Sequence, residues 1–167
     1  MQIEFIRLKN FRAFQDVTMK DIPRFCVLVG ANGTGKSTLF SVFAFLRDAM
    51  SSNVNSALAR LGGSRGLQEV RSRGSSGPME IELKIRTELR DKRSTLITYE
   101  LHIDEESGRA YVAREVLRYR RGSKGQPWRF LDFQRGAGEA VTNELESVED
   151  EGQLKREVQS LKSPDIK

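Results

Sequence analysis

Residues 30–37 read Gly30-Ala31-Asn32-Gly33-Thr34-Gly35-Lys36-Ser37, which matches the pattern G-x-x-x-x-G-K-[ST] without a mismatch. A glycine-rich turn of this kind lets the backbone adopt positive φ and approach a ligand closely, so the amides of Gly33 to Ser37 can surround an anion. The N-terminus of a following helix adds its dipole and its unpaired N–H groups. The stretch is therefore a P-loop, a motif that binds the phosphates of a nucleoside triphosphate.

Three side chains that close the motif have separate roles. Lys36 supplies a mobile point charge between the β- and γ-phosphates. The Ser37 hydroxyl is expected to ligate Mg²⁺, which prefers few protein ligands together with phosphate oxygens and water. Thr38 is expected to bond the α-phosphate. The sequence thus predicts Mg²⁺ and a nucleotide as cofactors.

The residues on either side of the loop have the periodicity that the motif needs. Phe25 to Val29 is a continuous apolar run, which predicts a strand buried on both faces. From residue 36 to about residue 49 the apolar positions follow helical spacing, which predicts an amphipathic helix. Its expected apolar stripe consists of Leu39, Phe40, Val42, Phe43, Phe45 and Leu46.

The rest of the chain divides by pattern. Ile3 to Lys9 and Phe14 to Met19 read as two strands, and residues 51–78 read as a long mobile connection with a helical turn at 55–61. Residues 79–135 alternate between apolar and polar positions, which predicts an antiparallel meander with a turn at 104–108. The polar tail, 136–167, is expected to hold a helix from Glu144 to Leu161.

The predicted fold class is therefore α/β, a P-loop NTPase lobe of the ABC-ATPase-head type with an added antiparallel β-sheet. The chain has 167 residues, enough for a single lobe with a sizeable core. The predicted lobe consists of four parts: the strand, P-loop and helix in 1–50, the loop region in 51–78, the antiparallel sheet in 79–135, and the tail in 136–167.

Composition narrows the functional class. The net charge of +5 permits contact with DNA but does not require it. No stretch is apolar enough for a membrane span and no secretory leader is visible, so a cytoplasmic protein is expected. The single cysteine, Cys26, fits a reducing compartment and reads as a small buried core residue, and the lone His102 reads as solvated surface.

Hydrolysis needs acidic residues that the sequence does not supply clearly. The one apolar strand ending in acids, Leu101 to Glu106, alternates with polar residues and reads as a hairpin instead. Leu61-Gly62-Gly63-Ser64 faintly resembles an ABC signature but reads as loop. No Asn-Lys-x-Asp motif is present, so the nucleotide is expected to be ATP rather than GTP. No catalytic residue is assigned.

The first fifty residues resemble one family. Ile3 and Ile6 precede Leu8-Lys9-Asn10-Phe11-Arg12, and the apolar strand and P-loop follow at the spacing seen in RecF/SMC-like ABC ATPases, which include RecF, RecN, SMC proteins and OLD-type AAA ATPases. The resemblance implies an ATPase whose heads dimerise around ATP, acting on DNA in repair, chromosome maintenance or defence. It also implies contacts near the nucleotide from Lys9, Asn10 and Arg12.

The same resemblance also implies three sequence motifs of the family that we do not find in this sequence. The Q-loop, signature and acidic strand should follow the antiparallel sheet, and Gln68 and Gln134 lie too early for the Q-loop role. We therefore expect the lobe of a longer ATPase, which alone hydrolyses ATP poorly or not at all. Two alternatives stay open: a nucleotide-sensing interaction module without hydrolysis, and a P-loop phosphotransferase.

Overall fold

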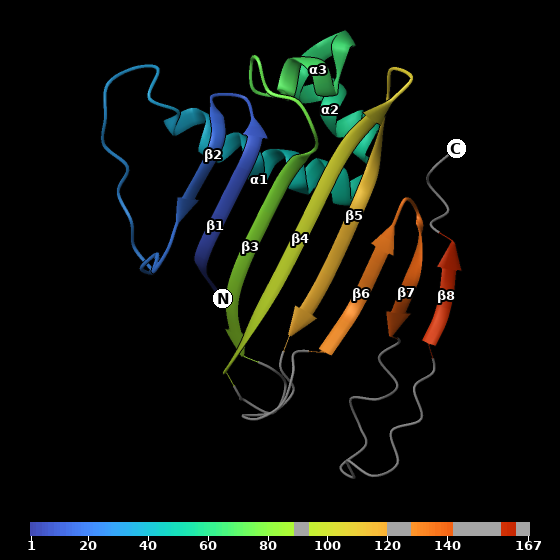
Figure 1. The fold of residues 1–167 in the computed structure, drawn as a ribbon. Helices are drawn as coiled ribbons and strands as arrows, with labels where there is room; N and C mark the ends of the chain where they lie inside the picture. The colour runs from blue at the N-terminus through green and yellow to red at the C-terminus, as the bar shows by residue number, and fades with distance from the viewer. Residues whose placement is uncertain (89–93, 120–127, 142–157, 163–167) are drawn as a thin grey trace.

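A single antiparallel sheet forms the frame of the molecule (Figure 1). The computed structural model describes residues 1–88, 94–119, 128–141 and 158–162. Within these ranges eight strands lie in the order β2-β1-β3-β4-β5-β6-β7-β8, and each pair of neighbours is antiparallel. Their bounds are β1 Gln2–Phe11, β2 Phe14–Met19, β3 Met79–Glu88, β4 Ser94–Glu106, β5 Arg109–Tyr119, β6 Trp128–Gln134, β7 Ala137–Val141 and β8 Val158–Lys162.

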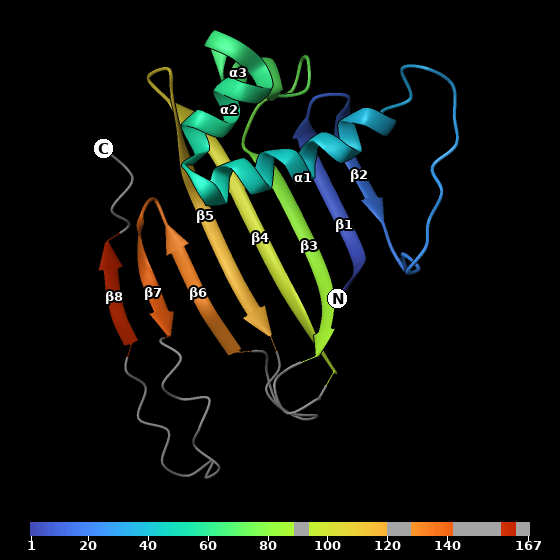
Figure 2. The ribbon, with the colours of Figure 1, turned by 180° about the vertical axis from the view of Figure 1, so that it is seen from behind.

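The helices all lie on one face of this sheet. They are α1 Lys36–Ser51, α2 Val54–Gly62, the 3₁₀ turn η1 Gly63–Arg65 and α3 Leu67–Val70. Figure 2 shows α1 crossing the strands from β2 towards β5, with α2 and α3 stacked beyond its C-terminal end. Among the described helices, none is long and apolar enough to cross a membrane.

The core lies between the helices and strands β1, β3 and β4. Alternate residues of these strands point to the helices, since successive side chains of a strand face opposite sides. Ile81 and Leu83 of β3 are 1% and 5% exposed, and Phe45 of α1 is 1% exposed. The other buried members include Ile6, Leu8, Phe11, Val42, Leu46, Ala57, Leu58, Leu67, Val70, Met79, Tyr99, Leu101 and Ile103.

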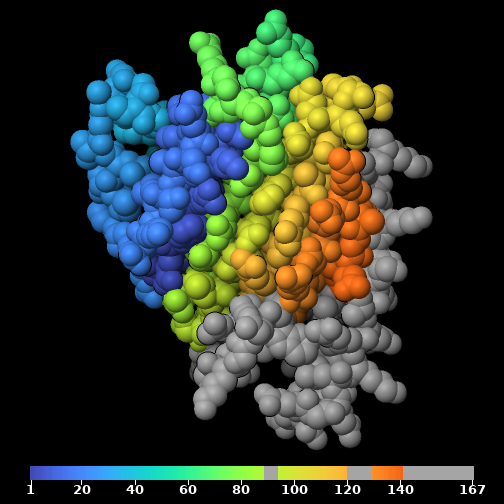
Figure 3. All heavy atoms as spheres, viewed as in Figure 1, coloured from blue at the N-terminus to red at the C-terminus, as the bar shows by residue number. Residues whose placement is uncertain are grey.

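No described helix covers the other face of the sheet, and that face carries charged pairs. Figure 3 shows it as a continuous surface of β1, β3, β4 and β5. Arg7 of β1 pairs with Asp16 of β2 at 2.7 Å, and Arg118 of β5 pairs with Glu100 of β4. Opposite charges on neighbouring strands are the usual stabilising arrangement for a solvated sheet face.

The meander was predicted correctly. Strands β3, β4, β5 and β6 occupy the segment where apolar and polar residues alternate. The β4–β5 hairpin closes at Ser107 and Gly108, which have φ of 52° and 77°. Glycine and small polar residues favour this left-handed conformation. The expected hairpin therefore forms, although β4 extends through Glu106 and shortens the turn.

The prediction of a long mobile connection over residues 51–78 is wrong for its first part, except for the helical turn predicted at 55–61, which lies within α2. Residues 54–70 form α2, η1 and α3, and Leu58 and Val70 are buried in the core. The physical reason is a local cap: the Asn53 side chain accepts a hydrogen bond from the N–H of Ser56 at 2.8 Å, which satisfies a free donor at the start of α2. The glycines at positions 62, 63 and 66 lie at the boundaries between α2, η1 and α3, and they do not prevent these helices from forming.

The predicted buried strand before the P-loop is also wrong. Residues 25–29 have no strand neighbour among the described residues, and Phe25, Val27 and Val29 are 83%, 65% and 90% exposed. Cys26, expected in the core, is exposed with them. The backbone N–H of Ile22 still donates a hydrogen bond to the carbonyl oxygen of Glu4 in β1, at 3.1 Å. After Ile22 the chain leaves the sheet. A strand needs hydrogen-bonded neighbours, and no described strand lies beside residues 25–29.

Two further expectations differ from the structure. The predicted helix from Glu144 to Leu161 falls mainly on 142–157, outside the described residues, but its last part is wrong because 158–162 form β8. That strand pairs with β7 and satisfies its edge hydrogen-bonding groups. Phe40, expected on the apolar stripe of α1, is 63% exposed.

Candidate nucleotide-binding site

The N-terminus of α1 is left open by the fold. Gly35 is its N-cap residue, with φ of 92°, and no side chain caps the helix. The first intrahelical hydrogen bond runs from the N–H of Leu39 to the Gly35 carbonyl at 2.9 Å. The N–H groups of the first turn before Leu39 therefore have no partner within the helix. An uncapped N-terminus with its dipole is a ready site for an anion.

The glycines of the loop are required by conformation and by space. Gly33 and Gly35 have φ of 86° and 92°, a region in which side chains are strained. A Cβ built on Gly35 would lie 2.7 Å from Cε1 of Phe14, so this glycine also admits the aromatic ring of β2. Phe14 thereby fixes the P-loop against the edge of the sheet.

Lys36 closes the loop on itself. Its Nζ donates to the carbonyl oxygens of Gly30 and Ala31, each at 2.6 Å. The Thr34 hydroxyl also donates to Ala31, at 2.9 Å. Hydrogen bonds from an ammonium group to phosphate are stronger than those to neutral carbonyls. A phosphate group near the loop would therefore draw Lys36 away from these carbonyls.

The donor set suits a Mg²⁺–phosphate complex. Ser37 is exposed, and its hydroxyl makes no hydrogen bond to any residue that the structure describes. A free hydroxyl beside open amides can serve as the single protein ligand of Mg²⁺. Elsewhere in the described ranges, no group of three or more His, Cys, Asp or Glu side chains could hold a metal ion.

The three weaker candidates for nucleotide contact are placed differently from one another. Lys9 lies on the open sheet face, where it pairs with Glu80 at 2.8 Å. Asn10 is 5% exposed, and its amide donates to the carbonyls of Ser76 and Pro78 at 3.2 Å and 2.9 Å. Its position supports the loop that enters β3.

Arg12 occupies the turn between β1 and β2, two residues before Phe14. Its φ of 50° is uncommon for a residue with a side chain. Its N–H donates to the Val70 carbonyl and its Nη2 to the Leu61 carbonyl, both at 2.6 Å. Arg12 is therefore held between the edge of the sheet and the α2–α3 region.

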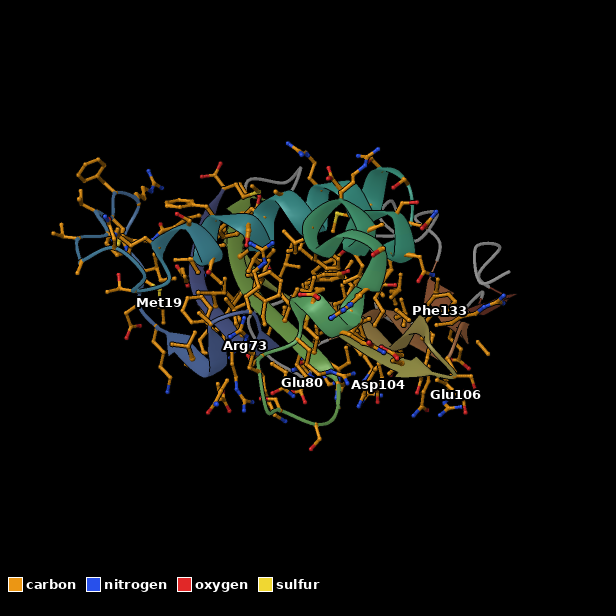
Figure 4. All side chains as sticks on the ribbon, turned by 90° about the horizontal axis from the view of Figure 1, so that it is seen from above. Met19, Arg73, Glu80, Asp104, Glu106 and Phe133 are labelled. Carbon is orange, nitrogen blue, oxygen red and sulfur yellow. The ribbon has the colours of Figure 1, made fainter. Side chains whose placement is uncertain are left out.

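The acidic residues of β4 are engaged away from the P-loop. Asp104 accepts from Arg71 at 3.1 Å, and Glu105 accepts from Gln68 at 2.8 Å. Strands β1 and β3 separate β4 from β2, beside which α1 begins (Figures 1 and 4). This position agrees with the interpretation of Leu101 to Glu106 as hairpin rather than as the acidic strand of an ATPase. His102 lies half-buried in the same strand.

Sequence reasoning missed two features beside the site. One is the contact of Phe14 with Gly35; the other is the pair Arg71 and Arg73, which follows α3 and faces the β1–β2 turn. The Ser72 hydroxyl between these arginines donates to the Phe14 carbonyl at 2.7 Å. Their spacing, Arg-Ser-Arg, is visible in the sequence, but only the fold brings it next to Phe14.

Comparison with known proteins gives one family match and one similar solved structure. No curated protein matches it. A solved structure from work on ATP-driven dimerisation and DNA-stimulated activation of SMC ATPases is similar, with a TM-score of 0.47 and 20% identity, over 77% of this chain and 72% of that one. The model of a family described as "AAA domain, putative AbiEii toxin, Type IV TA system" matches residues 25–157. The match covers most of the chain and includes the P-loop, and the chain therefore belongs to this AAA-domain family.

Proposed function

We propose that this chain is the ATP- and Mg²⁺-binding lobe of an ATPase of the RecF/SMC-like type. The observation that carries the proposal is the uncapped N-terminus of α1, with Lys36 held over the carbonyls of Gly30 and Ala31. Open amides, a positive dipole and a redeployable ammonium group together suit a triphosphate. Membership of an AAA-domain family supports the same reading.

In this proposal each residue of the loop contacts a different part of the nucleotide or of Mg²⁺. The amides of 33–38 surround the β-phosphate, and Lys36 exchanges its two carbonyl partners for β- and γ-phosphate oxygens. Ser37 supplies the protein ligand of Mg²⁺, which neutralises charge on the phosphates when bound. Thr38 contacts the α-phosphate. Phe14 packs against Gly35 and keeps the loop at the sheet edge while these contacts form.

Hydrolysis in this proposal needs groups from outside the described lobe. Asp104 and Glu105 are engaged by Arg71 and Gln68, so neither is free to activate water at the P-loop. The apolar residues Phe25, Val27 and Val29 are exposed just before the loop. Their exposure supports a surface on which another part of the ATPase, or a second head, packs around ATP. Action on DNA in repair, chromosome maintenance or defence belongs to that assembly.

The test measures Mg²⁺–ATP binding by titration calorimetry for the wild type and Lys36→Ala. We expect the substitution to weaken binding by about 10- to 100-fold, because a charge-assisted phosphate contact contributes about 1.5–3 kcal/mol. Lys20→Ala is the matched control, since Lys20 is an exposed lysine at the end of β2. Equal affinity for both variants and the wild type would refute the proposed site.

Turnover measured on the assembled ATPase, rather than on this chain alone, separates the enzyme from the main alternative. A nucleotide-sensing module would bind ATP stoichiometrically and never hydrolyse it, in any assembly. The pairing of Asp104 with Arg71 favours this reading for the lobe alone. ATP hydrolysis that is abolished by Lys36→Ala and not by Asp104→Asn would instead place the hydrolytic acid elsewhere in the assembly.

A further inference from the structure

A hollow at the β1–β2 turn is lined by several arginines. Its volume is about 370 Å³, and it lies where the β1–β2 turn meets the loop that follows α3. Arg12 lines it from the turn, and Arg71 and Arg73 line it from the loop. The one acidic lining residue, Glu69, pairs with Arg65 at 3.2 Å. The lining therefore holds three arginines, of which Arg71 pairs with Asp104, and one carboxylate, which pairs with Arg65.

The walls of the hollow are fixed by hydrogen bonds. Arg12 is anchored to the Val70 and Leu61 carbonyls, each at 2.6 Å. The Ser72 hydroxyl holds the Phe14 carbonyl at 2.7 Å. These contacts join the β1–β2 turn to the loop after α3 before any ligand arrives. A preformed site loses less conformational freedom when it binds.

Two of the arginines have unused donors. Arg71 donates through Nη2 to Asp104, but its buried Nε–H has no hydrogen-bond partner among the described residues. Arg73 is exposed and has no ion pair within the described ranges. Figure 4 shows Arg73 and Asp104 at the end of the sheet where α3 lies. Each guanidinium carries five N–H donors in a planar fork, so much of the donor capacity here is free.

We infer that this hollow binds a phosphate group. Arginine forks match the oxygens of a phosphate and form paired, charge-assisted hydrogen bonds with it. An acceptor in the hollow would meet the donors of exposed Arg73 and those of Arg12 that do not bond the Leu61 carbonyl. The group belongs either to a small phosphate compound or to the backbone of a nucleic acid. No P-loop residue lines the hollow, so this inference does not rest on the proposed function.

The test uses Lys36→Ala protein, in which the P-loop is impaired, and two probes: inorganic pyrophosphate and a short single-stranded DNA oligonucleotide. Binding of each is measured at low salt with and without Arg73→Gln. Arg109→Gln is the matched control, because Arg109 is an exposed arginine at the β4–β5 hairpin and does not line the hollow. Neither substitution removes a buried contact, so both variants are expected to fold.

We expect Arg73→Gln to weaken at least one probe by about tenfold, the effect of losing one charge-assisted phosphate contact, while Arg109→Gln leaves it unchanged. Loss of pyrophosphate binding would identify a small phosphate compound as the source. Loss of oligonucleotide binding alone would identify a nucleic-acid backbone. If neither probe binds, or if both substitutions weaken binding equally, the inference is overturned, since equal losses would reflect net charge alone.

Discussion

Two segments whose sequences both predict strands have opposite environments in this molecule. Ile81 and Leu83 of β3 are 1% and 5% exposed, whereas Phe25 and Val29 are 83% and 90% exposed. Strand β3 lies between β1 and β4 and beneath the helices. Residues 25–29 have no strand beside them in the described structure. The comparison shows that apolar composition favours burial, but hydrogen-bonded neighbours and a covering layer decide it.

The largest expected effect is a contrast in stability between the two segments. Ile81→Ala should lower the free energy of unfolding by about 2–5 kcal/mol, because it removes methyl groups and leaves a cavity in a packed core. Val29→Ala should change it by less than about 0.5 kcal/mol. Urea denaturation followed by circular dichroism measures both values.

A matched pair removes the difference in residue type. Val116 of β5 is 1% exposed, so Val116→Ala should cost about 1–3 kcal/mol while Val29→Ala costs almost nothing. Comparable losses at positions 29 and 116 would mean that residues 25–29 are packed in solution. The contrast between the two segments would then be lost.

A smaller difference is expected between the two glycines that let the exposed segment turn into α1. Gly33 and Gly35 both have positive φ, but a Cβ on Gly33 meets nothing within 4 Å, whereas one on Gly35 meets Phe14 at 2.7 Å. Gly33→Ala should destabilise by about 1–2 kcal/mol from backbone strain alone. Gly35→Ala should cost about 1–3 kcal/mol more from overpacking.

Thermal unfolding of the two glycine variants checks this difference. Phe14→Leu in the Gly35→Ala background should recover part of the additional loss, because a smaller side chain leaves room for the new methyl group. Equal melting temperatures for Gly33→Ala and Gly35→Ala would contradict the packing of Phe14 against the P-loop.

The smallest expected effect concerns the charged pairs of the sheet. The hydrogen bond from Arg86 holds the pKa of Glu4 below its ordinary value of 4.5. A carboxyl with a lowered folded-state pKa stabilises the fold above its unfolded pKa and loses that contribution as the pH falls through the folded value. Urea midpoints of wild type and Glu4→Gln should therefore differ slightly near neutrality and converge in acid. A difference between the two urea midpoints that grows as the pH falls would contradict this prediction.

The parts of the fold that sequence predicts well are those set by local pattern. Alternating residues in 79–106 identify β3 and β4, and the spacing of Val42, Phe45 and Leu46 identifies α1. The helical turn predicted at 55–61 lies within α2, but the rest of 54–70 was expected to be loop because its glycines and serines outweighed the cap at Asn53. The segment 25–29 was predicted wrongly because a strand depends on neighbours that its own residues do not specify.

The candidate site likewise contains some features that the sequence predicts and others that only the fold reveals. The P-loop is a local motif, so its glycines, Lys36 and Ser37 can be predicted as nucleotide-binding residues from sequence spacing alone. The contact of Gly35 with Phe14, and the meeting of Arg12 with Arg71 and Arg73, join residues far apart in the chain. No local pattern encodes such contacts, because they depend on the path of the chain through β2 and α3.

Amide hydrogen exchange with and without Mg²⁺–ATP tests the central claim most directly. The claim is that the exposed turn before α1 is where the nucleotide binds. We predict that ATP slows exchange at residues 30–38 and leaves β3 unchanged, since β3 is already protected. Lys36→Ala should abolish the slowing. Protection that appears elsewhere and not at 30–38, or that persists in Lys36→Ala, would contradict the account.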